Sequence, residues 1–206
     1  MVCHTIDTIA AVFTAIGTVS VAVLAIWGDQ IRDRLFGPRL ELSLVDPKGD
    51  LTFIENANAK RYYYHLRVSN QKGRNAAIGT RVVIQGHSRR TPSGQFVRQP
   101  LVYPLQLQWT PAGWNEIERT VVHDSTCDFG HVGQFELKFH PTLLSWPNNF
   151  AGFVGKDECV RFEIAAVGHN VLSPVPSVFE VSWDGRWTEN QEEMQRRLVI
   201  RKVPEL

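Results

Sequence analysis

The sequence predicts a mainly β protein in which one N-terminal transmembrane helix precedes an antiparallel β-sandwich or barrel. The first observation is an uncharged run of 20 residues near the start of the chain, Thr8–Trp27. The second is a change from helical spacing to alternation of apolar and polar residues from Arg39 onward. The third is the frequency of Gly, Pro and Asn between short apolar runs, which favours strands joined by turns over a βαβ arrangement.

The uncharged run has the length of a membrane span. A helix of about 20 residues crosses the hydrocarbon core of a bilayer, and Trp27 stands where interfacial aromatic residues are found. A cleaved signal peptide would need a basic region at its start, and residues 1–8 contain neither Lys nor Arg. We therefore divide the chain into a short extracytoplasmic N-terminus (1–7), a transmembrane helix (8–28), a juxtamembrane connector (29–38) and a soluble β domain (39–206).

The charges that flank the run predict its orientation. No Lys or Arg precedes it, whereas Arg32, Arg34 and Arg39 follow it. Because basic residues stay on the cytoplasmic side of a membrane, we expect the N-terminus outside and the C-terminal domain in the cytoplasm, at the inner (plasma) membrane. The spacing of the three cysteines does not suggest a disulfide framework, and the chain contains no N-x-[ST] sequon. Neither observation calls for a secreted protein.

The connector is expected to continue the helix for a short distance. Ile31, Leu35 and Phe36 recur at helical spacing, which predicts an amphipathic turn at the membrane surface. Gly37-Pro38 then ends the helix.

The domain that follows is predicted to contain eight or nine short strands. The clearest is Arg61–Ser69, where Tyr62, Tyr64, Leu66 and Val68 alternate with polar residues, so one set faces the core. Asp184-Gly185, between Trp183 and Trp187, predicts a tight hairpin. Further strands are expected at Leu40–Leu44, Ala77–Gln85, Leu105–Trp109, Gln134–Phe139, Cys159–Val167, Val178–Trp183 and Leu198–Val203, with a helix at Glu189–Arg197 and long linkers at Gly86–Pro100 and Trp109–Gly133. The pattern suits a sandwich of immunoglobulin-like plan.

Charge is distributed unevenly along the domain. Residues 57–115 contain no Asp or Glu and nine Lys or Arg, whereas residues 116–206 hold 14 acidic and nine basic residues, a net charge of −5. Such a basic block gives one side of a domain a positive potential. It predicts an anionic partner, namely a nucleotide-like ligand, an anionic lipid headgroup or an acidic protein surface; bulk nucleic-acid binding is not expected. The alternative is a solvated basic face that complements the acidic half, within the fold or between subunits.

Within the basic block we expect the anion-binding residues to be Arg67, Arg74 and Arg81, with Tyr63 beside them. Arginine offers planar, paired donors to phosphate, and Tyr63 shares a strand face with Arg67 by the period of two. Arg74 lies in the turn that follows this strand, and Arg81 lies on the next strand. Because sequential antiparallel strands usually pair, the three arginines are predicted to line one edge of one face.

A second group of polar residues has the composition of a metal site. His123, Cys127 and His131 follow one another as H-x3-C-x3-H, and these residue types bind zinc. The spacing matches no zinc motif, and a fourth ligand is not evident. We therefore expect a polar loop at this position and no metal.

Enzyme signatures are absent from the sequence. It contains no G-x-S-x-G, no P-loop and no H-E-x-x-H. The Asp128-Phe129-Gly130 triplet has none of the motifs that accompany it in kinases. We therefore predict a protein that is not an enzyme and needs no cofactor, with a hydrolase assembled from distant residues as a further alternative.

The transmembrane helix carries small residues in stripes. Ala11, Ala15, Thr18, Ala22 and Ala25 recur at spacings of three to four, and Gly17 lies on a different face with Ser20. Small residues allow two helices to approach closely. The stripes predict a homo-oligomer formed through the helix, although Ala and Gly are common in membrane helices in any case.

The layout of an anchor at Thr8–Trp27 followed by a compact β domain resembles that of bacterial single-pass membrane proteins with a cytosolic β domain. It is also similar in plan to the membrane-acting effectors of nucleotide-triggered antiphage defence, in which a β domain senses a cyclic nucleotide and membrane helices oligomerise to damage the membrane. The resemblance covers the whole chain and is one of architecture, so it implies no binding residues. The sequence thus predicts a membrane-anchored binding or sensor module that recognises an anionic ligand or partner. The alternative is a structural or accessory subunit of a membrane protein complex.

Overall fold

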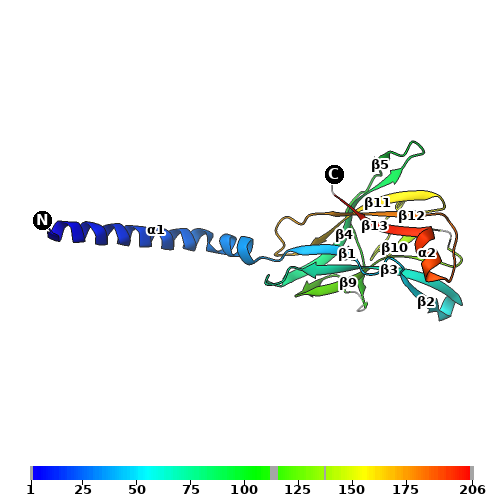
Figure 1. Cartoon of the computed structure of the whole chain (residues 1–206), viewed down its shortest axis with the longest axis horizontal. Helices are drawn as coiled ribbons and strands as arrows, with labels where there is room; N and C mark the ends of the chain where they lie inside the picture. The colour runs from blue at the N-terminus through cyan, green and yellow to red at the C-terminus, as the bar shows by residue number, and fades with distance from the viewer. Residues whose placement is uncertain (1, 112–115, 137, 205–206) are drawn as a thin grey trace.

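The structure, a computed structural model, describes residues 2–111, 116–136 and 138–204. A long N-terminal helix, α1 (Val2–Phe36), leaves one end of a β-sandwich (Figure 1). The other helices of the described residues are short, namely the 3-10 turn η1 (Glu55–Ala57) and α2 (Gln191–Arg197). The prediction of a mainly β protein with one short helix near the C-terminus is confirmed.

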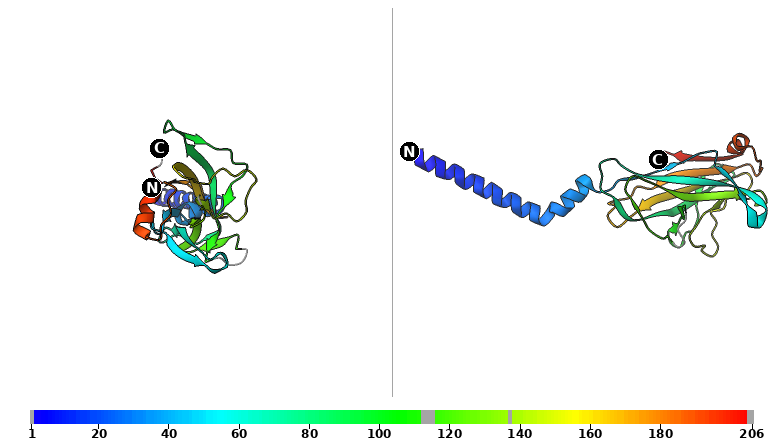
Figure 2. Two further views of the ribbon diagram at one scale, coloured as in Figure 1. Left: turned by 90° about the vertical axis from the view of Figure 1, so that its right-hand side faces the viewer. Right: turned by 90° about the horizontal axis from the view of Figure 1, so that it is seen from below.

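Two antiparallel sheets make up the sandwich. Its strands within the described residues are β1 (Leu40–Leu44), β2 (Asp50–Ile54), β3 (Ala59–Asn70), β4 (Ala77–Arg90), β5 (Phe96–Arg98), β6 (Leu105–Gln106), β7 (Trp109–Thr110), β8 (Arg119–Val121), β9 (Asp124–Gly133), β10 (His140–Pro141), β11 (Glu158–Val167), β12 (Ser177–Trp183) and β13 (Leu198–Val203). The first sheet has the order β1-β3-β9-β10, with β2 also on β3 and β7 also on β9. The second has the order β13-β12-β11-β4-β5, with β6 and β8 also on β4. The sheets pack over one shared core (Figure 2).

The alternation predicted for the tyrosine-rich strand is present in β3. Tyr62, Tyr64, Leu66 and Val68 are fully buried, whereas Arg67 on the opposite face is exposed. Each such buried apolar side chain contributes about 1.5–3 kcal/mol. Because β3 pairs with β1 and β2 on one side and with β9 on the other, it organises the first sheet.

The strand β9 occupies a segment that the sequence predicts to be a long linker. Asp, Ser, Gly and Cys give this segment low strand propensity, but propensity is overridden where a strand pairs with a buried neighbour. Here the neighbour is β3, which pairs along most of its length with β9. The strand predicted at Gln134–Phe139 is wrong, because a turn follows β9 there and Phe139 forms only an isolated bridge to Val154.

A β-bulge resets the alternation of β9. His65 lies opposite Asp128 and Tyr64 lies opposite Gly130, so Phe129 is an extra residue in the strand. Phe129 turns into the core, where its ring packs edge-on against that of Phe139 with centroids 5.4 Å apart. A Cβ atom on Gly130 would lie 2.4 Å from the Phe139 ring, so a larger residue there would displace it.

The tight hairpin predicted at Asp184-Gly185 is also wrong. These residues form a turn with Gly185 at φ +80°, but the chain then enters α2, and β12 pairs with β13 beyond it. The helix itself was expected and begins slightly later than predicted, because Asn190 caps it. The Asn190 side chain accepts a hydrogen bond from the Glu193 N–H at 3.0 Å.

The helix α1 is bent. Its segments Phe13–Val23 and Ala25–Phe36 meet at 63°, a bend that is visible in Figure 2. Over the described residues, neither segment alone is long and apolar enough to cross a bilayer, and the pair meets these criteria only when taken together. The transmembrane span therefore stays a prediction. The helix ends at Phe36, before Gly37-Pro38, as the sequence predicts.

The small residues of α1 whose side chains are described are exposed. Ala15, Gly17 and Ala22 are exposed, and a Cβ atom on Gly17 would meet no other atom within 4 Å. Ala11 belongs to the helix, but its side chain lies outside the described part of the structure. These positions leave room for a second helix, and self-association stays a prediction.

We expect Ala15→Ile to weaken any oligomer that forms through α1, because a branched side chain prevents two helices from approaching closely. Ile16→Val is the matched control, since this position lies about 100° further round the helix. Analytical ultracentrifugation in detergent measures the oligomer. An Ala15→Ile variant of unchanged size would contradict the prediction.

Candidate functional site

The C-terminal end of α1 is capped by the sandwich. The last carbonyl groups of a helix have no partners within it. Here the turn between β3 and β4 supplies them, because the Arg74 guanidinium donates to the Leu35 carbonyl and the Asn75 N–H donates to the Phe36 carbonyl at 2.8 Å. The Gly37 N–H donates to the Asp33 carbonyl at 2.7 Å and closes the last turn. Hydrogen bonds therefore connect the helix directly to the sandwich.

One buried side chain, that of Asn70, holds this end of the sandwich together. Asn70 ends β3 and is 7% exposed. Its Oδ1 accepts from the Arg39 N–H at 3.1 Å, and its Nδ2 donates to the carbonyls of Asn75 at 2.7 Å and Val122 at 3.3 Å. It thereby joins the linker after α1, the β3–β4 turn and the segment between β8 and β9.

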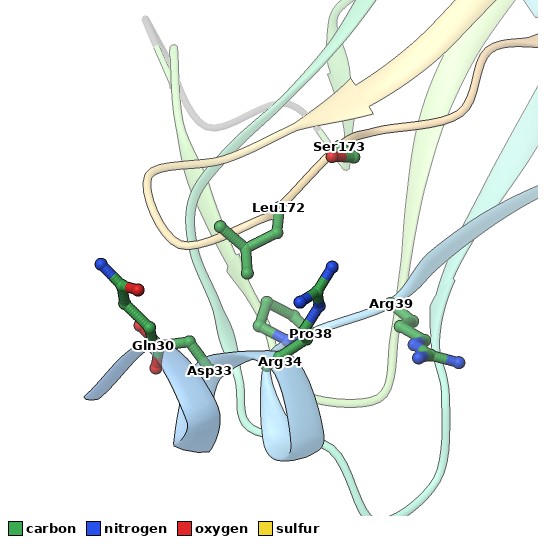
Figure 3. Close-up of a pocket in the computed structure, with 8 residues that line it drawn as sticks. Gln30, Asp33, Arg34, Pro38, Arg39, Leu172 and Ser173 are labelled. Atoms are coloured by element: carbon green, nitrogen blue, oxygen red, sulfur yellow. The ribbon is translucent and has the colours of Figure 1, made fainter. Parts of the chain in front are cut away.

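A cavity of about 480 Å³, which we call the junction cavity, lies between the end of α1 and the loop that joins β11 to β12 (Figure 3). The Arg34 guanidinium extends toward this loop, and Leu172 points from the loop toward the helix (Figure 3). The Arg39 guanidinium lies on the other side of the linker, directed away from Leu172. The cavity is lined by Gln30, Asp33, Arg34, Gly37, Pro38, Arg39, Leu172 and Ser173.

Arg39 also lines a second hollow, of about 390 Å³, on the other side of the linker. This hollow is bounded by Arg39, Leu40, Glu41, Ser69, Asn70 and Gln71. Arg39 is therefore placed between two surface depressions, both at the end of the sandwich from which α1 departs.

The two arginines that line the junction cavity have no carboxylate partner among the described residues. Arg34 and Arg39 form no ion pair with any residue that the structure describes. The nearby Asp33 carboxylate lies 4.0 Å from Arg32, which is also 3.1 Å from Asp29. A guanidinium group without a carboxylate partner can offer paired donors to an oxyanion. The junction cavity is therefore the candidate anion site of the structure.

The predicted anion site is not assembled in one place. Arg67 and Tyr63 lie on β3 in the first sheet, whereas Arg81 lies on β4 in the second, so the expected pairing of these two strands is wrong. Arg81 lies 3.7 Å from Glu118, and Arg74 caps α1. Of the four predicted residues, only Arg74 belongs to the junction. Their predicted role in anion binding is otherwise not tested by the geometry.

Most of the basic block forms ion pairs with the acidic half of the domain. Five of its nine cations contact carboxylates that follow residue 115, as the alternative interpretation of the charge pattern predicts. The pairs are Lys60–Glu189, Arg61–Glu136, Arg81–Glu118, Arg89–Glu158 and Arg98–Glu163. An anion bound at these positions would have to compete with a carboxylate.

The three candidate metal ligands are not brought together. Cys127 is fully buried in the core on the inner face of β9, His131 lies on its outer face, and His123 precedes the strand. Without the bulge at Phe129, residues 127 and 131 would share a face. Across the described residues no group of three or more His, Cys, Asp or Glu side chains is arranged to hold a metal ion.

His65 cross-links three strands on the outer face of the first sheet. Its Nδ1 lies 2.8 Å from Asp128 on β9, and its Nε2 lies 3.2 Å from Asp50 on β2. The hydrogen bond with Asp128 raises the pKa of His65; burial opposes this rise, and the charges of Asp128 and Asp50 add to it. Because both ring nitrogens contact carboxylates, this imidazole acts as a structural cross-link and not as a free base.

The pKa of the neighbouring His131 is shifted in the opposite direction. Burial lowers its pKa to about 4, and the nearby charges of Arg61 and His140 act in the same direction against Glu136. The surroundings of two histidines on adjacent strands of one face thus shift their pKa values in opposite directions.

Comparisons with protein-family models, with curated proteins and with solved structures find no match for this chain. They therefore provide no catalytic family.

Sequence reasoning used some junction residues for other purposes and missed the rest. Arg34 and Arg39 served only to predict orientation, and Leu172 and Asn70 were not singled out. No local pattern brings residues 34, 39 and 172 together, because their proximity depends on how the sheets pair. The sequence offered one weak signal of the junction, namely an Asn at the end of a strand with one apolar face, since a buried Asn needs hydrogen-bond partners.

We expect Asn70→Ala to reduce the free energy of unfolding by about 2–4 kcal/mol, because it leaves an N–H and two carbonyls without their partner. Urea unfolding followed by tryptophan fluorescence measures the change, and amide exchange should become faster in the last turn of α1. Asn148→Ala, at an exposed loop position, is the control and should shift stability by less than about 0.5 kcal/mol. Equal effects of the two substitutions would refute the bridging role of Asn70.

The raised pKa of His65 predicts a pH-dependent contribution to stability. The protonated imidazole is favoured in the folded state, so its contribution is complete below about pH 6.5 and is lost as the pH rises through the raised pKa. His65→Gln should therefore lower the free energy of unfolding more at about pH 5.5 than at about pH 9. For His131, whose pKa is lowered, stability is lost as the pH falls from about 6.5 toward 4, so His131→Gln should cost more at the higher pH. Urea titrations at both pH values measure these differences, and a pH-independent effect of His65→Gln would count against the cross-link.

Proposed function

We propose that this protein is a membrane-tethered binding module that recognises an anionic group where α1 meets the sandwich. The observation that supports the proposal is the junction cavity, in which neither Arg34 nor Arg39 forms an ion pair with a described residue. Planar guanidinium groups suit phosphate-type oxygens because they donate two hydrogen bonds in parallel. The proposed site lies in a different place from the basic strand face that the sequence predicts.

The charge distribution supports the junction over the rest of the basic block. Lys60, Arg61, Arg81, Arg89 and Arg98 already contact carboxylates. Releasing such a pair to bind a ligand would cost part of the binding energy. The arginines of the junction cavity need no such exchange.

One electrostatic effect opposes anion binding at this position. The C-terminal end of a helix carries a partial negative charge of about half an electron. At α1 this charge is reduced because Arg74 and Asn75 donate to the last carbonyls. The full positive charges of Arg34 and Arg39 exceed what remains, so the junction still favours an anion.

Through the capping interactions, ligand binding at the proposed site would also affect α1. Arg34 precedes Gly37-Pro38 and Arg39 follows it, so an anion that draws both side chains together would act on the two sides of the linker. The helix would respond directly because the β3–β4 turn holds its last carbonyls. A sensor of cyclic nucleotides in antiphage defence, the plan that this chain resembles, would use the same phosphate chemistry.

An accessory subunit of a membrane protein complex is the second candidate, and one observation favours it. Trp146 stacks on Phe153 with ring centroids 5.4 Å apart and nevertheless remains 48% exposed, with Leu144 exposed in the same loop. Exposed aromatic side chains are enriched at protein interfaces. This loop lies outside the junction, so the two candidates can be tested separately.

Three measurements test the proposed function. The full-length protein should stay in the membrane pellet after carbonate extraction, and a phosphatase fused to its C-terminus should be inactive in the periplasmic assay. In detergent at low salt, the protein should bind inorganic pyrophosphate or dihexanoyl phosphatidylglycerol in a calorimetric titration. Arg34→Ala together with Arg39→Ala should weaken this binding by about a hundredfold or more, because each bidentate guanidinium contributes about 1.5–3 kcal/mol.

The matched control is the double variant Arg67→Ala, Arg81→Ala, which removes the same charge from the predicted basic face. It should bind the two probes as the parent protein does. If neither probe binds, or if the control loses as much affinity as the junction variant, the anion site is not at the junction.

A further inference from the structure

We infer that the helix-proximal end of the sandwich is a docking face for an anionic phospholipid surface, with the β11–β12 loop inserted among the lipid headgroups. The inference rests on the proposed function, because it requires α1 to hold the domain at a membrane. It names the anionic group that the junction recognises as the phosphate layer of the bilayer itself. The docking face comprises the β11–β12 loop, the last turns of α1, Arg39 and the β3–β4 turn.

The loop has the chemistry of a membrane-inserting segment. Residues 168–176 contain no Asp, Glu, Lys or Arg, and the side chains of Leu172 and Val175 are 59% and 65% exposed. Pro174 and Pro176 have no backbone N–H, so fewer donors need a partner when the tip leaves bulk water. Two large apolar side chains at the tip of an uncharged loop are costly in water and favourable at a lipid interface.

The base of the loop is anchored, so its tip is held in position. The His169 N–H donates to the Ile78 carbonyl at 2.9 Å, and the Ile78 N–H donates to the Asn170 side chain at 2.8 Å. The same side chain donates to the Ala76 carbonyl at 2.9 Å, and Val171 packs against the core. Only the segment beyond Val171 projects outward. The loop reaches back toward the end of α1 (Figure 1).

Basic side chains lie at the same end of the protein as the apolar tip, and two of them, Arg34 and Arg39, line the cavity that Leu172 also lines. Arg32, Arg34, Arg39, Lys72 and Arg74 lie in the last turns of α1, the linker and the turn that caps the helix. Asp29 and Asp33 contact only Arg32, which is one of these five cations, and Asp124 at the start of β9 forms no ion pair with a described residue. Counting these three carboxylates against the five cations leaves a net charge of +2 at this end of the described chain. Glu118 and Glu41 are paired with Arg81 and Lys202.

The combination of charge and apolar surface favours a bilayer over a soluble phosphate compound. A free phosphate would account for Arg34 and Arg39 but leaves Leu172, at the rim of the same cavity, in water. A bilayer surface accounts for both, since cations attract the anionic headgroups while apolar side chains enter the interface. The apolar part of α1 leaves from this same end, so an anchored helix would bring the docking face to the headgroup level (Figure 1).

The test uses the full-length protein in nanodiscs, with a polarity-sensitive fluorophore on Leu172→Cys or, separately, on Val175→Cys, both in a Cys3→Ser background. Cys127 and Cys159 are buried and stay unlabelled in the folded protein. Val97→Cys, on β5 away from the helix, is the matched control position. The nanodiscs contain phosphatidylcholine alone or with about one third phosphatidylglycerol, which supplies the negative surface potential of a cytoplasmic leaflet.

With phosphatidylglycerol present, the probes at positions 172 and 175 should shift to the blue, be quenched by brominated lipid chains and lose iodide quenching by about threefold or more, as expected for an interfacial site. The probe at position 97 should show none of these changes. Arg39→Glu together with Lys72→Glu should return the probe at position 172 to its behaviour in phosphatidylcholine alone, whereas Arg67→Glu should not.

Two outcomes separate failure of this inference from failure of the proposed function. If the protein resists carbonate extraction and binds pyrophosphate through Arg34 and Arg39, but the probes at positions 172 and 175 remain as accessible to iodide as the probe at position 97, lipid docking is overturned and the binding module stands. If carbonate releases the protein from membranes, the proposed function fails and the inference fails with it.

Discussion

The connection between α1 and the sandwich depends on the hydrogen bonds of a single buried amide. Asn70 holds the Arg39 backbone, the β3–β4 turn and the segment before β9 in one place, and that turn in turn holds the last carbonyls of α1. Without these hydrogen bonds the Gly37-Pro38 linker would be a flexible hinge between the helix and the sandwich. With them, the junction cavity has defined walls on both sides, and a ligand that binds there contacts helix and sandwich together.

The charge pattern of the sequence has a structural explanation that does not require a ligand. A basic block followed by an acidic one becomes a set of cross-strand and loop-to-strand ion pairs once the two halves of the chain pack together. Pairs such as these, which remain partly exposed to water, each contribute only about 0–1 kcal/mol, so their main effect is to select complementary neighbours. Under the proposed function, the cations available for recognition are those without a carboxylate partner among the described residues, and the junction has several of them.

Sequence reasoning succeeded where local periodicity determines structure and failed where pairing does. The alternation of Tyr62 to Val68 identified β3 and its inner face correctly, and the C-terminal helix was found because its polar run differs from the strands around it. The strand β9 was not predicted because its Asp, Ser and Gly residues are typical of a loop, and its pairing with β3 is not visible in the sequence. The predicted anion-binding residues are not brought together for a related reason, since the chain passes from one sheet to the other between β3 and β4.

The bulge at Phe129 makes the length of β9 more important than most of its side chains. It reverses the inside-to-outside alternation, so that His131 faces outward and Val132 faces the core. Insertion of one further residue between Phe129 and His131 would exchange these two positions, placing an imidazole inside the sandwich and exposing an apolar side chain. Loss of one residue at the bulge would instead remove the bulge and leave His131 opposite Tyr63. In related chains, single-residue insertions in this strand should therefore be rare.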